Sequence, residues 1–168
     1  SGLVVQVSPL LGYAALRELA ERVHRGELGR RYGLFALHHL PRSAAAAVDD
    51  ALADLLHYAL EALESPVVGV YARRSALFGD QAGSWHAILR LADETLVTLE
   101  VGASLPAGWP EPERLLVEAT GSGAVLRAEP TRQMVVASDR AGSTRAVPWM
   151  PDPSAGYLEA ALARLEHP

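Results

Sequence analysis

LRELAERVHRGELG, residues Leu16–Gly29, contains a complete helix and its end. Leucine, alanine and valine recur in it at helical spacing, whereas arginine and glutamate occupy most of the other positions. Gly26 is typical of the left-handed residue that ends a helix, and the apolar run Tyr32–Leu37 follows a few residues later. The segment therefore predicts an amphipathic helix that stops at Gly26 and leads directly into a strand.

Elements of both kinds flank this segment. Leu3–Val7 is a short β-branched run, and Ser8-Pro9 opens the first helix, where proline is tolerated. Arg31–Leu40 is predicted as a strand and Ala44–Leu63 as a second helix. The apolar stripe of the second helix consists of Val48, Leu52, Leu55, Leu56, Ala59 and Leu63.

From Val67 onward the hydrophobic period changes from helical to two, which predicts that the rest of the domain is mostly sheet. Short turn-like joints at Ala92–Glu94, Gly121–Gly123 and Asp139–Gly142 favour antiparallel pairing. A last helix is expected at Ser154–Leu165. The expected strands are Val67–Arg73, Ser84–Leu91, Thr95–Val101, Arg114–Ala119, Ala124–Ala128, Met134–Ala137 and Thr144–Val147.

Alternation within the strands predicts that helices cover only one face of the sheet. Val97, Leu99 and Val101 point to one side of their strand, whereas Thr98 and Glu100 point to the other. The apolar side suits the helices, and the mixed side has the composition that a subunit contact needs. We therefore expect an α+β fold with an open, mostly antiparallel β-sheet, helices packed on one face, and a homo-oligomer formed through the other face.

The composition argues against several classes of function. The chain has 168 residues, is 49% hydrophobic and 21% charged, and carries a formal net charge of −5. These values fit one soluble globular domain and offer no basic field for nucleic acid or for an anionic membrane. All basic residues other than histidine are arginine, and cysteine is absent, so disulfides and thiolate metal sites are excluded. Apolar runs are too short to span a membrane, and we expect a cytoplasmic location.

Other arrangements of reactive residues lead to no site. His38 and His39 are adjacent in a strand and point to opposite faces, so we expect them to form no metal site. A Gly-x-Ser-x-Gly nucleophile elbow does not occur. Trp85, Trp109 and Trp149 are expected to anchor the core or an interface, and the loop 148–151 is a candidate contact.

Four segments in this order resemble a known enzyme family. LRELAERVHRGELG, PVVGVYA, HAILRLADETLVTLEVGASLP and LLVEATGSGAVLRAEP are similar to the C-terminal domain of the Gfo/Idh/MocA oxidoreductases, the glucose-fructose oxidoreductase and inositol dehydrogenase family. The resemblance covers nearly the whole chain. Its most specific parts are Gly26-x-Leu28-Gly29, the hairpin with Asp93-Glu94, and the Gly121-x-Gly123 turn.

The resemblance implies a domain that closes the substrate site and builds the oligomer interface of an NAD(P)-dependent enzyme. In that family a Rossmann domain holds NAD(P) and supplies a Glu-Lys-Pro lysine, and this chain has neither the glycine-rich strand-to-helix turn nor a lysine. We expect residues 1–168 to be a single domain that stands alone or was cut out, with residues 1–8 as the last strand and junction of a missing Rossmann domain. The isolated chain is expected to have no cofactor site and no activity, and a Rossmann domain is a candidate partner.

The resemblance also implies an aspartate and a histidine on the helix before PVVGVYA, four residues apart in the family. One alignment assigns them to Asp54 and His57, which are three apart and share a helix face, so that Asp54 would orient His57 as a general base. An alignment without a gap assigns them to Asp49 and Ala53 and removes the base. Two hypotheses follow: a substrate-side and oligomerisation domain of an oxidoreductase, or a degenerate binding or dimerisation module without catalysis.

Overall fold

The computed structural model describes residues 9–76 and 83–146. The α-helices are α1 (Ala14–His24) and α2 (Val48–Leu63), and the strands are β1 (Arg31–Pro41), β2 (Val67–Ala76), β3 (Gly83–Leu91), β4 (Leu96–Leu105), β5 (Arg114–Gly121), β6 (Val125–Glu129), β7 (Met134–Asp139) and β8 (Gly142–Ala146). Short 3-10 helices are η1 (Pro9–Gly12), η2 (Arg42–Ala47) and η3 (Pro130–Arg132).

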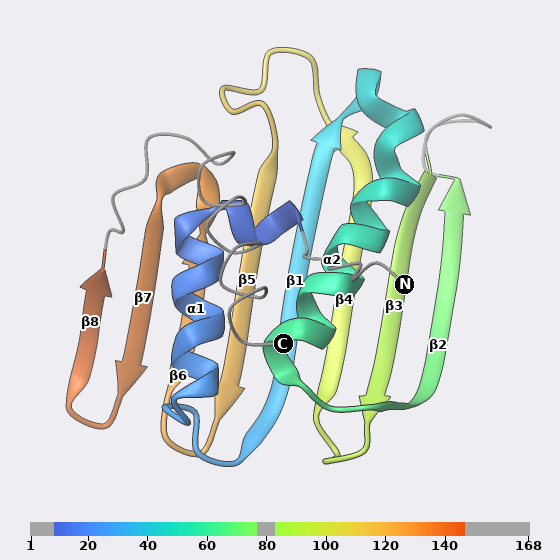
Figure 1. The fold of residues 1–168 in the computed structure, drawn as a ribbon. Coiled ribbons are helices and arrows are strands. Elements are labelled where there is room, and N and C mark those ends of the chain that lie inside the picture. Colours follow the sequence, from blue (N-terminus) through green and yellow to red (C-terminus); the bar gives the residue numbers. More distant parts are fainter. Residues whose placement is uncertain (1–8, 77–82, 147–168) are drawn as a thin grey trace, which may run out of the picture.

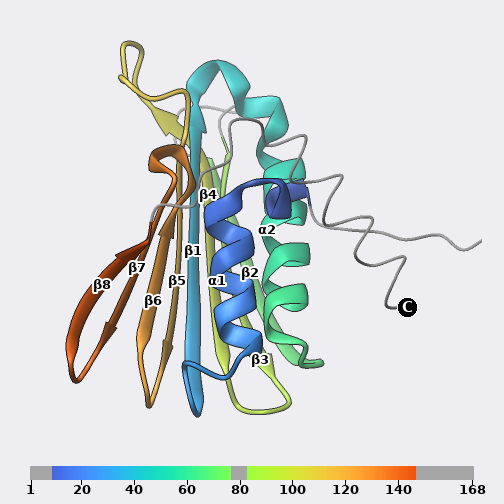
Figure 2. The same cartoon turned by 60° about the vertical axis from the view of Figure 1, so that its left-hand side comes forward.

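The eight strands form one sheet in the order β2-β3-β4-β1-β5-β6-β7-β8 (Figure 1). Strands β1 and β4 are parallel, and the other neighbouring pairs in this part of the chain are antiparallel. Figure 2 shows both helices on the same face of the sheet. The expected α+β fold, with an open and mostly antiparallel sheet, is confirmed.

Both helices end as their sequences predict. α1 buries its apolar stripe and is followed by Arg25 and by Gly26, whose φ of 77° is left-handed. α2 ends at Glu64, another left-handed residue, whose N–H donates to the carbonyl of Leu60 over 2.9 Å. Before α1 the chain forms η1 and then an extended Tyr13, so the helix begins later than Ser8-Pro9 suggests.

The two faces of the sheet differ as the alternation predicts. Val97, Leu99 and Val101 on β4 are completely buried beneath the helices. On the opposite face, strand register places Tyr71, Ile88, Thr98 and Phe35 in one row across β2, β3, β4 and β1. The exposed fractions of Tyr71, Ile88 and Phe35 are 65%, 44% and 36%. We call these four residues the open-face row.

Some expected boundaries are wrong or lie outside the described residues. β4 continues to Leu105, beyond the expected end at Val101, because pairing with β1 extends to Pro41. The expected strand Leu3–Val7, the expected helix Ser154–Leu165, and Trp149 with its loop 148–151 fall outside the described residues. Within the described segments, no helix is long and apolar enough to cross a membrane.

Two of the family-like segments form a single structural unit. The N–H of Gly123 donates to the carbonyl of Leu28 over 2.8 Å, and the N–H of Ser122 donates to the carbonyl of Arg30 over 2.9 Å. In return, the N–H of Arg30 donates to the Ser122 hydroxyl over 3.0 Å. The turn between β5 and β6 is thereby bonded to the link between α1 and β1, which explains why both segments are rich in glycine.

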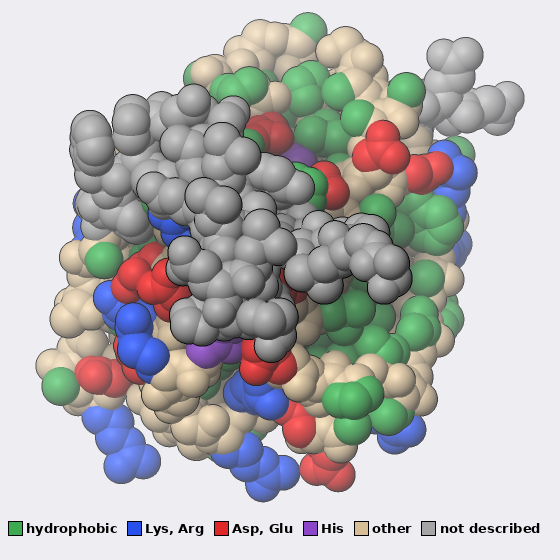
Figure 3. All heavy atoms as spheres, viewed as in Figure 1, with side chains coloured by type: hydrophobic (Ala, Val, Ile, Leu, Met, Phe, Trp, Pro, Cys, Tyr) green, Lys and Arg blue, Asp and Glu red, His purple; other side chains and the backbone are tan. Residues whose placement is uncertain are grey.

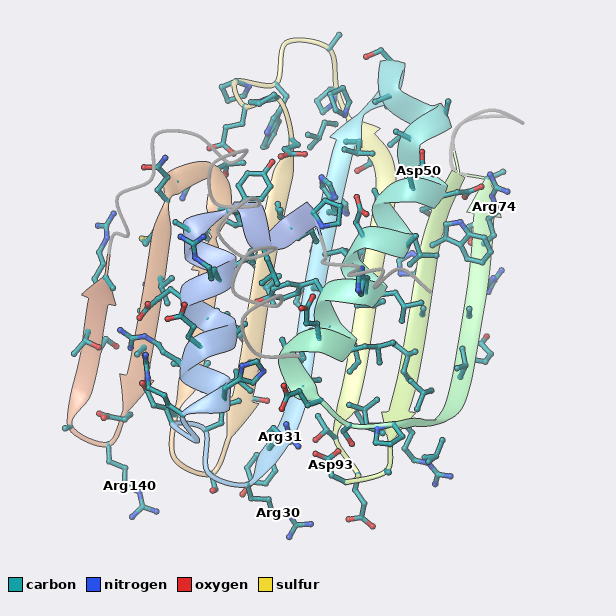
Figure 4. The ribbon with its side chains drawn as sticks, in the orientation of Figure 1. Arg30, Arg31, Asp50, Arg74, Asp93 and Arg140 are labelled. Carbon is teal, nitrogen blue, oxygen red and sulfur yellow. The ribbon has the colours of Figure 1, made fainter. Side chains whose placement is uncertain are left out.

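The hairpin between β3 and β4 is tied to the start of β1. One guanidinium nitrogen of Arg31 donates to Asp93 over 2.6 Å, and the other donates to the carbonyl of Leu63, the last residue of α2, over 2.5 Å (Figure 4). Burial opposes ionisation of Asp93, but hydrogen bonds from Thr95 and the charge of Arg31 outweigh it and hold the pKa of Asp93 below its ordinary value. Asp93 therefore has a structural role.

Candidate functional site

The two candidate catalytic residues lie one helical turn apart on α2. Asp54 and His57 are both partly buried. Burial and the charge of Asp50 raise the pKa of Asp54, whereas His38 and His57 act in the opposite direction. His38 belongs to β1, so the fold brings a second histidine into electrostatic contact with the Asp54 carboxylate. Seen from the helix side, acidic side chains gather near the start of α2 (Figure 3).

His38 is held by a glutamate from a distant part of the chain. Its Nε2 lies 2.6 Å from one carboxylate oxygen of Glu113, and the Tyr13 hydroxyl donates to the other carboxylate oxygen over 2.9 Å. His38 is 7% exposed, and its Nδ1 is buried without a hydrogen-bond partner among the described residues. A buried polar nitrogen without a partner costs free energy, so a hydrogen-bonding group placed at this nitrogen would be favoured.

The protonation states in this cluster follow from its contacts. Hydrogen bonding to His38 lowers the pKa of Glu113, and the opposing effect of burial is overcome with the help of the Tyr13 hydroxyl. Burial and the adjacent Glu113 carboxylate raise the pKa of Tyr13 to about 12. At neutral pH Glu113 is therefore an anion that accepts hydrogen bonds, and Tyr13 is a neutral donor.

A cavity of 470 Å³ adjoins this cluster. It lies between the start of α1, the segment 110–113 and the η3 turn, and Tyr13, Glu113, Thr131 and Arg132 supply polar groups to its wall. Such a volume lies within the range of roughly 300–1,000 Å³ that is usual for small-molecule sites. Asp54 and His57 do not line this cavity.

The alternative aspartate on α2 has a different environment. Asp49 lies at the start of the helix, and its carboxylate accepts a hydrogen bond from the indole N–H of Trp85 on β3 over 2.8 Å. Ala53, the partner of Asp49 in that alignment, is exposed. Trp85 and Asp49 thus join α2 to the sheet, as expected of a tryptophan that anchors the core.

His38 and His39 point to opposite faces, as predicted. His38 contacts Glu113 on the helix side, whereas His39 Nε2 lies 3.0 Å from Glu100 on the other side. Within residues 9–76 and 83–146, no three histidine, aspartate or glutamate side chains are grouped so that they could hold a metal ion.

Tyr13 and Glu113 are the members of the cluster that sequence reasoning missed. Tyr13 precedes the first regular helix, and Glu113 follows a proline-rich loop, so neither belongs to a periodic pattern. They are 100 residues apart in the sequence. The one local sign of a role for Glu113 was its position just before a strand, and this position does not indicate which residues it would contact.

The Gly-x-Gly turn does not fit a dinucleotide site. A pyrophosphate needs free backbone N–H groups at a strand-to-helix turn. Here the turn joins two strands, and the N–H groups of Gly121, Ser122 and Gly123 already donate to the carbonyls of Ala124, Arg30 and Leu28. Among the described residues, this turn therefore offers nothing to a phosphate.

Comparison with known proteins gives matches among solved structures. An oxidoreductase from Sinorhizobium meliloti matches with a TM-score of 0.76 and 14% identity, covering 99% of this chain and 55% of that one. This chain therefore shares the fold of about half of that oxidoreductase. An oxidoreductase from Agrobacterium radiobacter, solved with NAD+, L-tartaric acid and magnesium, matches with a TM-score of 0.71 and 14% identity, covering 95% of this chain and 52% of that one.

An inositol dehydrogenase homologue from Azotobacter vinelandii, solved with NAD+, matches with a TM-score of 0.66 and 13% identity over 84% of this chain and 43% of that one. The chain spans about half the length of the solved structures it matches. No family model matches the sequence. No curated protein matches it either.

Glu113→Gln is expected to change the acid dependence of stability. Because the pKa of Glu113 is lower in the folded chain than in the unfolded chain, its contribution is complete above the ordinary value of about 4.3 and is lost as the pH falls through the folded-state pKa. We expect the variant to lose about 2 kcal/mol at pH 7, the usual contribution of hydrogen bonds to a charged group, and to converge with wild type in acid.

Urea unfolding followed by circular dichroism between pH 7 and pH 3 measures this difference. Glu111→Gln is the matched control, because Glu111 lies in the same loop and its one ion pair with a described residue is the 3.5 Å contact with Arg132. Equal losses for the two variants, or a loss that does not vary with pH, would contradict the assignment of the cluster.

Proposed function

We propose that this chain is the substrate-side and oligomerisation domain of an NAD(P)-dependent oxidoreductase of the Gfo/Idh/MocA type and is inactive by itself. The observation that carries the proposal is the fold match over half of several oxidoreductases. Within that frame, Asp54 and His57 are the candidate catalytic pair, with His57 as general base and Asp54 as the group that orients it.

The polar cluster supports a substrate-side role. Asp54 lies within electrostatic range of both His57 and His38, and Glu113 is hydrogen-bonded to His38. These residues would bind and orient a polar substrate, and proton transfer would fall to His57.

The cofactor is proposed to come from a Rossmann domain, on the same or on another chain. The internal hydrogen bonds of the Gly121–Gly123 turn support this division, because they leave its N–H groups unavailable to a pyrophosphate. A coding sequence upstream with Gly-x-Gly-x-x-Gly and Glu-Lys-Pro would favour the oxidoreductase over the alternative, a degenerate stand-alone binding or dimerisation module. Ala53, at the histidine position of the ungapped alignment, is the observation that favours the alternative.

Self-association is proposed to occur through the open-face row. Three large hydrophobic side chains there are at least one third exposed, and with Thr98 they form one row across four strands. Aromatic and aliphatic side chains at the centre of a patch are typical of subunit interfaces.

We expect the isolated chain to be a dimer or larger in sedimentation equilibrium and to show no heat of binding when titrated with NAD+, NADP+ or their reduced forms. Ile88→Arg is expected to weaken association roughly 30-fold or more, because a charge would be buried at the centre of the contact. Ile88 is a suitable site because its side chain is already 44% exposed, so the substitution spares the core.

Val70→Arg is the matched control for this experiment. Val70 is 66% exposed on the neighbouring strand, but its register partner Leu89 is buried on the helix side, so Val70 points away from the open-face row. The proposed interface would be refuted if Ile88→Arg and Val70→Arg weakened association equally, or if the wild-type chain were a monomer. Micromolar binding of NAD(P) would refute the division of roles between this chain and a Rossmann domain.

A further inference from the structure

A second cavity, of 310 Å³, lies beside the loop that joins β4 to β5. This loop is the gold connection at the top of Figure 1, and in Figure 2 it bends toward the face that the helices leave free. Arg114, Leu116 and Arg127 line the cavity, and they alternate with buried residues along β5 and β6. These three residues belong to the free face, whereas Leu115, which also lines the cavity, is buried, so the cavity lies at the edge of the sheet; Asp54 and His57 do not line it.

Positive charge is concentrated in the wall of this cavity. Three guanidinium groups, from Arg114, Arg127 and Arg132, surround it together with two carboxylates, from Glu111 and Glu129, which leaves one net positive charge. The whole chain has a net charge of −5, so this sign is opposite to that of the protein. A cavity of this charge favours a ligand with a single negative charge.

The two carboxylates in the wall form ion pairs with only two of its three arginines. Glu129 is 13% exposed and pairs with Arg127 over 2.9 Å and with Arg132 over 3.1 Å. Arg132 also lies 3.5 Å from Glu111. Arg114 forms no side-chain hydrogen bond or ion pair with any described residue. Its guanidinium is thus the group in this wall that is available for a carboxylate, which it can bind through two parallel hydrogen bonds.

An aromatic ring borders the same cavity. Trp109 is 42% exposed and lines it, and the turn that carries Trp109 is held by a hydrogen bond from its N–H to the carbonyl of Pro106 over 3.2 Å. Leu116 adds an aliphatic side chain to the wall. A half-exposed indole beside an arginine offers a stacking surface to a flat ring that bears a charge.

We propose that this cavity binds a small organic monocarboxylate with a flat ring, its carboxylate on Arg114 and its ring against Trp109. A volume of 310 Å³ is at the lower end of the range for ligand sites and admits only a small molecule. A phosphate dianion is disfavoured, because Glu111 and Glu129 would repel its second charge. The cavity shares Glu111, Thr131 and Arg132 with the 470 Å³ cavity beside Tyr13, but Asp54, His57 and His38 do not line it.

Benzoate is the test ligand, and binding is followed in ¹⁵N-labelled protein through the indole N–H signal of Trp109, which Trp109→Phe identifies. We expect a saturable shift of this signal with benzoate and none with benzyl alcohol, which keeps the ring without the charge. Inorganic phosphate is expected to bind at least tenfold more weakly than benzoate. Arg114→Gln is expected to raise the dissociation constant for benzoate roughly tenfold, as for loss of a charge-assisted hydrogen bond.

Arg140→Gln is the matched control. Arg140 is also exposed, forms no interaction with described residues, and lies at the far end of the sheet from this loop (Figure 4). The proposal is overturned if benzyl alcohol shifts the signal as benzoate does, if phosphate binds as tightly, or if the two arginine variants bind alike. Repeating the titration with Ile88→Arg separates this result from self-association, and absence of binding in both proteins would also overturn it.

Discussion

Gly121→Ala is expected to lower the free energy of unfolding by about 3 kcal/mol. A Cβ at this position would overlap the carbonyl oxygen of Leu28 and would lie 2.8 Å from the Leu28 Cβ and 2.9 Å from the carbonyl oxygen of Arg30. Two of these three atoms belong to the backbone, so the turn must move away from the link between α1 and β1. That movement would also break the hydrogen bonds from Ser122 and Gly123.

Thermal and urea unfolding of the two proteins measures this loss. Gly69→Ala is the matched control, because Gly69 has an ordinary φ and a Cβ there would meet nothing closer than 3.9 Å. We expect the control to remain within about 0.5 kcal/mol of wild type. Equal effects of the two substitutions would show that the close approach between the two glycine-rich segments is not what stabilises them.

Tyr58→Ala is expected to cost about 4 kcal/mol, since removal of a large buried aromatic ring leaves a cavity. Tyr58 is completely buried between the helices, and its hydroxyl donates to the carbonyl of Leu16 on α1 over 2.9 Å. Burial strongly raises the pKa of Tyr58, so the hydroxyl remains a neutral donor. Because Tyr58 adjoins His57, loss of its ring would also loosen the helix that positions the candidate catalytic pair.

Tyr58→Phe separates the ring from the hydrogen bond. It keeps the packing and removes only the hydroxyl, so we expect a loss of about 1 kcal/mol. Urea unfolding followed by far-ultraviolet circular dichroism compares the three proteins. A Phe variant as unstable as the Ala variant would contradict this division, because the hydrogen bond would then matter more than the packing of the ring.

The helices and hairpins could be predicted because their signals are local. The apolar stripe of α1 and the left-handed Gly26 lie within one segment, and both were recognised correctly. The three short joints predicted the three hairpins, since a turn of a few residues permits little besides antiparallel pairing. The end of β4 was misplaced because β1, which extends it, comes from a distant part of the chain.

The candidate site was predicted less completely for the same reason. Asp54 and His57 share one helix, so their spacing was visible in the sequence, but the placement of His38 against Glu113 depends on β1 lying beside β5. Tyr13 precedes α1 and is 100 residues from Glu113, so the hydrogen bond between them also depends on the folded chain. The local pattern could show that His38 and His39 diverge, but it could not name their partners.

By itself, the sequence determined the order of elements, the apolar face of the sheet and the resemblance to an oxidoreductase domain, because periodicity and turn chemistry act over a few residues. Only the tertiary structure decided that the two glycine-rich segments bond to each other, that Asp93 holds Arg31, and that Tyr13, His38 and Glu113 form one cluster. These contacts join residues far apart in the sequence, and they form when strand order and burial bring the residues together.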